Sequence, residues 1–233
     1  MSARYAIYFS PASQSNLASF GEACLGRSAK RVRDADASST FSDNERWLAL
    51  TEKPAHYGFH ATLKAPFELR EGFSEEQLIQ SAKNFALNES AIELKTLAPR
   101  QLSHFLALTL DEQTQTLSAF AQRCVEDFDA FRQPLSEADR QRRLQQSLSE
   151  RQIELLDRHG YPYVAEQFRF HMTLSGKLRD QDSDFVEWVS STYHRLVENP
   201  PLLDRIALFT QADRQSPFVH LLDFPFPQSG ETR

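Results

Sequence analysis

The same five-residue pattern, Phe-His-x-Thr-Leu, occurs twice in this chain of 233 residues, as FHATL at 59–63 and as FHMTL at 170–174. The two histidines are 111 residues apart (171 − 60), which is far longer than the period of a solenoid repeat. After each copy, the apolar spacing predicts a helix and then two strands. We therefore expect a degenerate duplication and an α+β, bilobal fold, in which two mainly antiparallel sheets face a central cleft and helices pack outside.

The other elements follow from apolar spacing and from residues that start and stop helices and strands. Residues 74–87 open with SEEQ, a capping-box pattern that predicts the first turn of a helix. We treat residues 1–233 as a single bilobal domain, with one lobe around each motif histidine. The expected strands are 4–9, 59–63, 91–97, 104–110, 167–175, 204–211 and 217–224, and the expected helices are 14–25, 43–51, 74–87, 114–131, 136–158 and 182–197.

Each motif divides into two faces, because residues two apart in a strand point to the same side of the sheet. In the first copy, His60 and Thr62 share a face with Lys64. The residues that alternate with them are apolar in both copies and are expected to face the core. The second copy repeats the division, with His171, Thr173 and Arg169 on the polar face; the apolar residues are Phe59, Ala61 and Leu63 in the first copy and Phe170, Met172 and Leu174 in the second.

Two histidines on facing lobes suit the cleavage of a phosphodiester. The incoming oxygen must lose a proton and the leaving oxygen must gain one, and the two oxygens lie roughly in line on opposite sides of phosphorus. Imidazole titrates near neutral pH, so His60 and His171 can serve as general base and general acid, in either order. The Thr62 and Thr173 hydroxyls can donate to phosphate oxygens, and the cations on the same faces can add positive charge.

A metal site is the alternative for these histidines. His56 and His60 have a spacing that would suit a zinc pair on a helix. On an extended segment they would be about 13 Å apart, too far to share an ion. We therefore expect neither a metal nor any other cofactor. The sequence also contains no phosphate-binding glycine loop, no G-x-S-x-G and no dinucleotide fingerprint.

The overall charge favours a small substrate. The net charge is −6 and the pI is about 5.7, which argues against a surface that tracks long nucleic acid. Cys24 and Cys124 have no metal-ligand spacing and are interpreted as free thiols in a reducing cytoplasm. The first residues lack the apolar run of a signal peptide, and no stretch approaches the length of a membrane span. No membrane contact or obligatory protein partner is evident.

Residues 132–160 are highly charged and helical in period, and they look like an insertion. They can form a lid over the cleft, with Arg140, Arg142 or Arg143 reaching a second phosphate, or they can be a solvated helical hairpin. The basic clusters at 26–33 and 140–143 can likewise be solvated faces or a rim that attracts an anion. The tyrosines that are candidates for lining the cleft are Tyr5, Tyr8, Tyr57, Tyr161 and Tyr163.

The two motifs, together with RYAIYFSP at the N-terminus, YGFHATLKAPF and YPYV, resemble the 2H phosphoesterase superfamily. Within it they are similar to a bacterial subgroup associated with phosphonate-metabolism operons, and the resemblance covers nearly the whole chain. It implies a bilobal fold and metal-independent hydrolysis of a cyclic phosphodiester by His60 and His171, with Thr62 and Thr173 on the phosphate. The implied substrate is a small ribose cyclic phosphate, such as 5-phosphoribosyl 1,2-cyclic phosphate. The chain between the motifs is longer than a compact member would need.

Three alternatives stay open at this point. The same site can process 2′,3′-cyclic phosphates of RNA ends or nucleotides, it can bind such ends without turnover, or it can cyclise them. The sequence leaves undecided which histidine is the base and which oxygen of the cyclic phosphate leaves.

Overall fold

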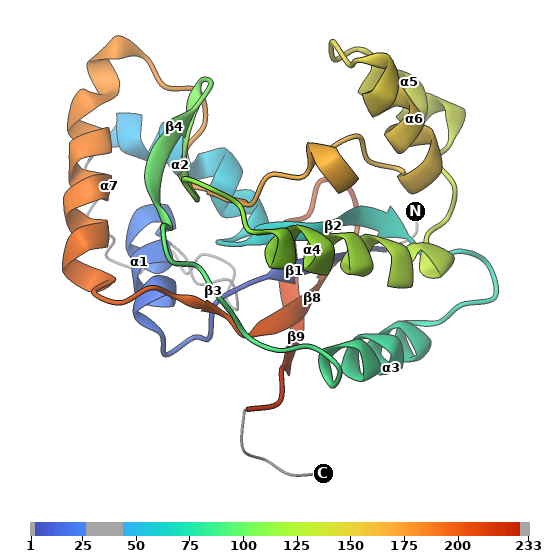
Figure 1. Ribbon diagram of the computed structural model, residues 1–233. Coiled ribbons are helices and arrows are strands. Elements are labelled where there is room, and N and C mark those ends of the chain that lie inside the picture. Colours follow the sequence, from blue (N-terminus) through green and yellow to red (C-terminus); the bar gives the residue numbers. More distant parts are fainter. Residues whose placement is uncertain (1–2, 27–43, 229–233) are drawn as a thin grey trace.

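A computed structural model of the chain describes residues 3–26 and 44–228 (Figure 1). Most of the basic cluster at 26–33 lies outside the described residues. The strands are β1 (Arg4–Phe9), β2 (Ala61–Glu68), β3 (Ile92–Glu93), β4 (Ala98–Leu102), β5 (Phe105–Thr109), β6 (His171–Thr173), β7 (Leu202–Leu203), β8 (Arg205–Gln211) and β9 (Val219–Pro225). The α-helices are α1 (Asn16–Leu25), α2 (Glu45–Tyr57), α3 (Glu75–Ala86), α4 (Gln115–Asp127), α5 (Glu137–Leu144), α6 (Glu150–His159) and α7 (Ser183–Leu196), with short 3-10 turns at Asp129–Phe131, Ala165–Gln167 and Asp180–Asp182.

The strands of the described residues form one seven-stranded sheet in the order β4-β5-β6-β2-β1-β8-β9, and β3 pairs separately with β7. Every strand pair is antiparallel. The two motif strands, β2 and β6, are neighbours, and their only registered pair is Ala61 with Met172. The two groups of strands, β4-β5-β6 and β2-β1-β8-β9, are thus joined edge to edge at this one position.

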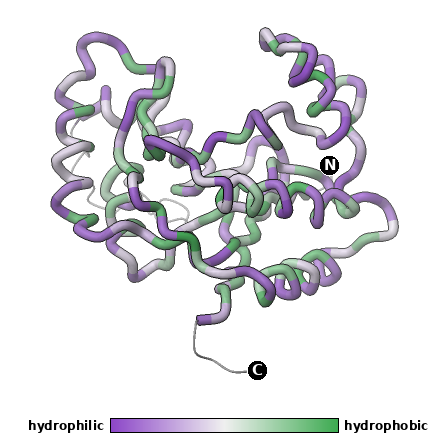
Figure 2. The backbone as a smooth tube through the Cα atoms, in the orientation of Figure 1, coloured by the Kyte–Doolittle hydropathy of each residue, from purple (hydrophilic) through white to green (hydrophobic). Residues whose placement is uncertain are grey.

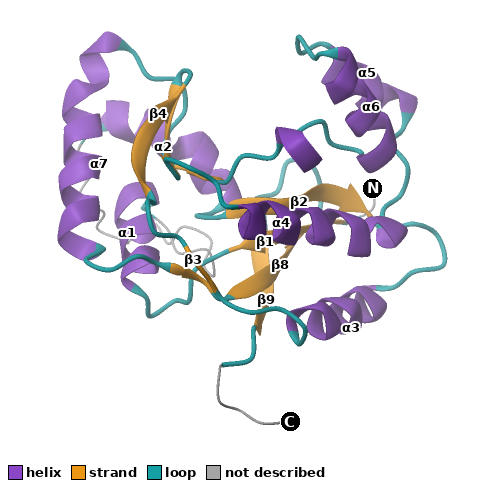
Figure 3. Ribbon diagram, in the orientation of Figure 1, coloured by secondary structure: helices purple, strands orange, loops and turns teal. Residues whose placement is uncertain are grey.

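The internal duplication is visible in the order of elements. The run β2-α3-β3-β4-β5 after the first motif is repeated as β6-α7-β7-β8-β9 after the second. The two runs are interlocked, because α3 packs against β8 and β9 whereas α7 packs against β4. The expected α+β fold class is confirmed. Figure 3 shows the sheet at the centre, helices around it, and α5 and α6 standing to one side at the end of connecting loops.

Helix ends follow the capping signals in the sequence. Ser74 accepts a hydrogen bond from the Gln77 amide, and the Gln77 side chain accepts one from the Ser74 amide, so the predicted capping box is confirmed. Ser149 and Gln152 form a second box at the start of α6. Such boxes satisfy backbone donors that a first turn leaves without partners. No helix in the described ranges is both long enough and apolar enough to span a membrane.

Helix α2 is longer than predicted and contains Pro54. A proline inside a helix removes one backbone hydrogen bond, here the one that would reach the Leu50 carbonyl. That carbonyl instead accepts a hydrogen bond of 2.6 Å from the amide of Gly176, just after the second motif. Gly58 then ends the helix with φ of 78°, a backbone angle that favours glycine, and leads directly into the first motif. The proline therefore leaves the Leu50 carbonyl free to accept a hydrogen bond that connects α2, before the first motif, with the segment after the second motif.

Several other expectations differ from the structure, and the strand expected at 59–63 is β2, which begins at Ala61. The strand expected at 91–97 is reduced to the two residues of β3, and β4 was not expected at all. The strand expected at 167–175 is confined to β6, since a 3-10 turn occupies Ala165–Gln167. The charged segment forms two helices, and α5 has no buried residue. Short strands that pair at sheet edges carry a weak signal of apolar alternation, which explains why β3 and β4 are hard to predict.

The core lies mainly on one face of the sheet. The apolar residues of both motifs, Phe59, Ala61, Leu63, Phe170, Met172 and Leu174, are buried in it, as expected. A smaller cluster on the other face consists of Ala6, Tyr8, Ala207, Phe209 and Phe218. Hydrophobic colour follows the strands and the inner sides of the helices that cover them (Figure 2).

Gly21 on α1 fixes the position of the first motif. A Cβ atom at residue 21 would lie 2.1 Å from Cδ1 of Phe59, the residue before His60. We expect Gly21→Ala to lower the free energy of unfolding by about 1–3 kcal/mol through overpacking, although alanine is the better helix former. Chemical denaturation measures this change. The matched control is Ser19→Ala on the exposed side of the same helix, which should be neutral or slightly stabilising. Equal stability of Gly21→Ala and wild type would contradict this packing.

Candidate active site

The two motif histidines are held in the same way. Nδ1 of His60 donates to the Gly58 carbonyl at 2.8 Å, and Nδ1 of His171 donates to the Arg169 carbonyl at 2.8 Å. A carbonyl can only accept, so each contact places a proton on Nδ1 and leaves Nε2 as the atom that can exchange a proton. Nε2 of His60 is 3.3 Å from the Thr62 hydroxyl. The repeated sequence therefore produces a repeated local geometry.

The junction of β2 and β6 brings the motifs together. Ala61 pairs with Met172, so His60 and Thr173 flank this pair on one side while Thr62 and His171 flank it on the other. Both apolar partners are buried in the main core, which leaves the four polar side chains on the opposite face. Diagonal neighbours across an antiparallel pair are about 7–8 Å apart, which is the separation that the register implies for the two histidines.

Tyr8 supports His60 from the neighbouring strand β1. The two rings are stacked, with centroids 3.8 Å apart and an angle of 24° between their planes. Tyr8 is 1% exposed. Burial, and then the nearby Tyr57 and Tyr161, raise the pKa of Tyr8, so its hydroxyl stays neutral. A buried, neutral aromatic face restricts the tilt of the His60 ring without adding charge beside it.

A cavity of about 560 Å³ opens over this face. Its described lining includes four cationic side chains and no aspartate or glutamate, although the whole chain carries a net charge of −6. A cavity of this size can hold a small ligand, and its charge favours an anion. The lining residues used below are Arg4, Tyr8, Lys53, Tyr57, His60, Thr62, His104, Phe105, Arg143, Tyr161, Thr173, Ser175 and Lys177.

Seven of the candidates named from the sequence line this cavity: His60, Thr62, Thr173, Tyr8, Tyr57, Tyr161 and Arg143. His171 is not in the lining. It is partly exposed and stands beside it, with its ring centroid 6.2 Å from that of Phe105, which is a lining residue. The remaining candidates, Lys64, Arg169, Tyr5 and Tyr163, lie elsewhere.

Lys64 faces away from the cavity because the strand contains a bulge. The register pairs Tyr8 with Thr62 but Ile7 with Lys64, so Leu63 is an extra residue on β2. An extra residue reverses the alternation of faces. Nζ of Lys64 is buried beneath α4, where it donates to the Val125 carbonyl and to Asp129, both at 2.7 Å. Burial lowers the pKa of Lys64 to about 8, although Asp129 opposes the shift.

The other three candidates do not line the cavity, for simpler reasons. Tyr5 lies on the core face of β1, where burial and then Glu75 raise its pKa to about 12. Arg169 is exposed and contributes its backbone carbonyl to His171. Tyr163 is 39% exposed, and it is the neighbouring Tyr161 that lines the cavity.

Several lining residues were not selected from the sequence. Arg4 alternates with Ala6 and Tyr8 along β1, so the face rule that was applied to the motifs would have found it. Lys53 was missed because α2 was expected to end before it. His104 lies in the turn between β4 and β5 and lines the cavity. Lys177 follows the end of β6, beyond the reach of strand alternation.

The described residues were also compared with the side-chain groups that bind metal ions. Within the described residues, no group of three or more histidine, cysteine, aspartate or glutamate side chains could hold a metal ion. Cys24 and Cys124 are both buried free thiols, and burial raises their pKa values.

The family described as "Protein of unknown function (DUF1045)" matches residues 62–219. The chain belongs to this family. Its two Phe-His-x-Thr-Leu motifs resemble those of the 2H phosphoesterase superfamily. Two curated relatives, each 36% identical to this chain, are both named ribose 1,5-bisphosphate phosphokinase PhnN. The relative from Janthinobacterium sp. (strain Marseille) aligns over 98% of this chain and 52% of its own length; the one from Laribacter hongkongensis (strain HLHK9) aligns over 77% and 41%. The chain thus spans about half the length of the curated relatives it matches.

Two solved structures are similar at 12% sequence identity. A conserved protein of unknown function from Agrobacterium tumefaciens strain C58 has a TM-score of 0.45 and covers 96% of this chain and 87% of its own. E. coli LigT in complex with 3′-AMP has a TM-score of 0.44 and covers 98% and 100%.

The burial of Lys64 predicts a pH-dependent contribution to stability. The folded-state pKa of about 8 lies below the ordinary lysine pKa of 10.5, so between these values the unfolded chain binds more protons and stability rises with pH. The free energy of unfolding of wild type, minus that of Lys64→Met, should therefore increase as the pH rises from about 8 to about 10.5. Urea unfolding of both proteins across this range measures the difference. A difference that stays constant with pH would show that Lys64 is not desolvated.

Proposed function

We propose that this protein hydrolyses a small cyclic phosphodiester by general acid–base catalysis, with His60 and His171 as the two proton-transfer groups. The observation that carries the proposal is the matched pair of His-x-Thr motifs at the β2–β6 junction, each with Nδ1 bound to a backbone carbonyl. This arrangement supports two Nε2 atoms acting on one phosphorus. A ribose cyclic phosphate fits the size of the cavity and its cationic lining.

The proposed step consumes one water molecule. One histidine takes a proton from the water, whose oxygen forms a bond to phosphorus while the ester bond on the other side breaks. The second histidine gives its proton to the leaving oxygen, so that the pair returns to its starting state after exchange with solvent. Thr62 and Thr173 donate hydrogen bonds to the non-bridging oxygens. The lining cations stabilise the charge that develops there, as preorganised donors do in other phosphoryl transfers.

The names of the curated relatives suggest which ester bond breaks. Those proteins are named for the phosphorylation of ribose 1,5-bisphosphate. If 5-phosphoribosyl 1,2-cyclic phosphate is opened by breaking the bond between phosphorus and O2, the phosphate stays on O1 and the product is ribose 1,5-bisphosphate. We infer that this chain makes the compound that its relatives are named for consuming. The chain has no G-x-x-x-x-G-K-[ST] sequence, and we propose no kinase activity for it.

A second candidate reaction is the opening of 2′,3′-cyclic phosphates on nucleotides or RNA ends. The observation in its favour is the pair of aromatic rings, Tyr57 and Tyr161, in the cavity lining, because a nucleobase stacks on such rings. The third possibility is a protein that binds these nucleotide or RNA ends in the same cavity without turnover. Assays on both substrate classes distinguish the three possibilities.

The first test is activity in an excess of EDTA. We expect the purified protein to open a ribose 1,2-cyclic phosphate under these conditions, with the reaction followed by phosphorus NMR. His60→Ala and His171→Ala should each lower kcat by about 100- to 10,000-fold, because each removes one proton-transfer group. The matched control is His194→Ala, a change of an exposed histidine on α7. Full activity in either motif variant, or saturable binding without turnover in wild type, would overturn the proposal.

The second test identifies the product. With 5-phosphoribosyl 1,2-cyclic phosphate as substrate, we expect the phosphate to remain on O1. The phosphorus–proton coupling pattern in the NMR spectrum assigns the carbon that carries the phosphate. A product with the phosphate on O2 would mean that the bond between phosphorus and O1 breaks, which would contradict the inferred product and leave the acid–base chemistry standing.

A further inference from the structure

A second cavity, of about 490 Å³, adjoins the first one. The two share four lining residues, Arg4, Ala65, Pro66 and Arg143. The second cavity lies between the end of β2, helix α5 and the loop that follows β8. Its polar lining includes Glu68, Arg132, Asp139, Arg142, His159 and Arg214. Arg4 and Arg143 therefore stand at the border between the cavity of the motif histidines and the second cavity.

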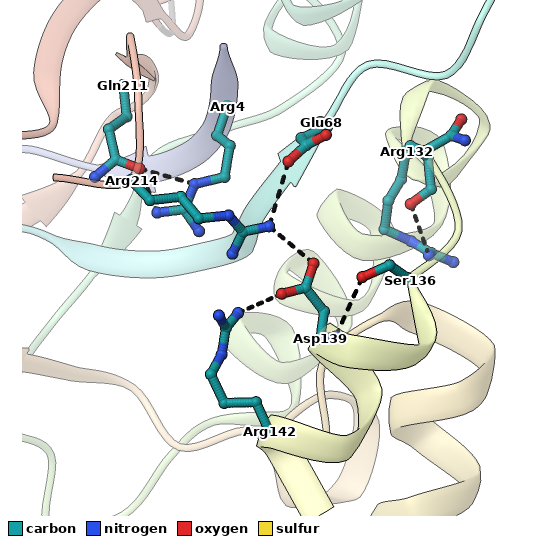
Figure 4. Close-up of polar contacts among 9 residues, drawn as sticks. Arg4, Glu68, Arg132, Ser136, Asp139, Arg142, Gln211 and Arg214 are labelled. Atoms are coloured by element: carbon teal, nitrogen blue, oxygen red, sulfur yellow. Dashed lines mark hydrogen bonds and ion pairs between the residues drawn. The ribbon is translucent and has the colours of Figure 1, made fainter. Parts of the chain in front are cut away.

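Two arginines of the second cavity are neutralised by carboxylates. Arg214 contacts Asp139 at 2.8 Å and Glu68 at 3.3 Å, and Arg142 contacts Asp139 at 2.5 Å. Figure 4 shows Arg214 and Arg142 each reaching a different carboxylate oxygen of Asp139, with Arg4 alongside Arg214. Although burial raises the pKa of Asp139, the hydrogen bond and charge of Arg214 lower it overall, so the carboxyl is ionised.

The two shared arginines have no such partner. Arg4 donates through Nε, at 2.7 Å, and through Nη2 to the neutral Oε1 of Gln211, and its guanidinium lies 5.4 Å from the centre of the Phe218 ring. Arg143 lies 5.2 Å from the centre of the Tyr161 ring. In the described part of the chain, neither forms an ion pair with a carboxylate. Arg132, the fifth arginine of the lining, pairs with Asp129, which lies outside the lining. The other four, Arg4, Arg142, Arg143 and Arg214, exceed the lining carboxylates Glu68 and Asp139 by two positive charges (4 − 2).

The Arg4 side chain is held in place before any ligand arrives. Gln211 is 1% exposed, and its Nε2 donates to the Ser216 carbonyl at 2.7 Å, which fixes Oε1 toward Arg4. Burial, and then the charge of Arg214, lower the pKa of Arg4, which remains far above neutrality. An anion binds strongly to a fixed, partly desolvated guanidinium that has another cation beside it. The anion offsets the repulsion between the two positive charges.

We propose that Arg4 and Arg143, with Arg214 and Arg142 behind them, form a subsite for a phosphomonoester on the substrate, at the end opposite the cyclic phosphate. The inference rests on the proposed function, and it selects among the substrates of that function. A phosphomonoester carries about −1.5 to −2 charges at neutral pH, which matches the difference of two, and guanidinium groups bind it through paired hydrogen bonds. A nucleobase carries no such charge.

The subsite also links two parts of the molecule. Arg4 belongs to β1 in the sheet, whereas Arg142 and Arg143 belong to α5, which has no buried residue of its own. The ion pair from Asp139 to Arg214 is one of the contacts that hold α5 near the sheet. A phosphate bound between Arg4 and Arg143 adds a second connection. The substrate's own charge therefore helps to position the segment 132–160 over the cavity.

The test compares ribose 1,2-cyclic phosphate with and without a 5-phosphate. We expect wild type to prefer the phosphorylated substrate by about 10- to 100-fold in kcat/KM, the effect of one or two charge-assisted hydrogen bonds. In Arg143→Gln, the ratio of kcat/KM for the two substrates should be about tenfold smaller than in wild type. The matched control is Arg140→Gln on the same helix, because Arg140 pairs with Asp157 and lines neither cavity. This control should keep the wild-type preference.

Binding of ribose 5-phosphate, measured by calorimetry, separates the subsite from catalysis. We expect wild type and Arg140→Gln to bind it and Arg143→Gln to bind it at least about tenfold more weakly. Turnover of both cyclic phosphates with equal kcat/KM would overturn the subsite and leave the proposed function standing. Binding that depends on Arg143, without turnover of either cyclic phosphate, would overturn the function and support the subsite. No turnover and no binding would overturn both.

Discussion

The pairing of Ala61 with Met172 is the contact on which the site depends. It is the only registered pair between β2 and β6, and it joins two groups of strands that are otherwise held by their own neighbours. Because both side chains are buried, the residues on either side of them must face the opposite way. The hydrogen bond from Gly176 to the carbonyl freed by Pro54 fastens the same two segments a second time. A duplicated chain thereby places two copies of one motif on a common surface.

The electrostatics of the cavity follow from where the carboxylates lie. The chain is acidic overall, yet the described lining of the first cavity contains cations and no carboxylate. Asp129 pairs with the buried Lys64 on the far face of β2, and Asp157 pairs with Arg140 between α5 and α6. These carboxylates thus pair with cations away from the cavity, and the positive charges of the described lining are left without carboxylates beside them in that lining. Such a separation attracts an anionic substrate while the rest of the surface stays acidic.

Much of this arrangement could be predicted from the repeated motif alone. The pattern predicts that the two histidines and two threonines share one face and that the apolar residues between them are buried. This prediction holds because side chains alternate between the two faces near the β2–β6 junction. The same rule failed at Lys64, only two residues beyond Thr62, because a bulge at Leu63 is decided by pairing with β1 and leaves no mark in the sequence of β2. Tyr5 failed for a different reason, because alternation along β1 places it on the core face, opposite Arg4 and Tyr8.

The placement of several lining residues depends on tertiary structure rather than on local sequence. Lys53 lines the cavity because α2 continues through Pro54, which required an external donor for the freed carbonyl. Arg4 and Arg143 meet only because the sheet and the inserted helices border one cavity. Patterns in a single sequence describe local periodicity, so they do not predict which distant segments border the same cavity. The joining of the two strand groups into one sheet is likewise a property of the assembled fold.

The central claim is that the two histidines have different roles on one phosphorus atom. The pH dependence of kcat/KM tests it most directly, when wild type is compared with His60→Ala and His171→Ala at their residual rates. A general base and a general acid together produce a bell-shaped profile. The account predicts that one variant loses the acidic limb of the bell and the other loses the alkaline limb. Retention of both limbs in either variant, or loss of the same limb in both, would contradict it.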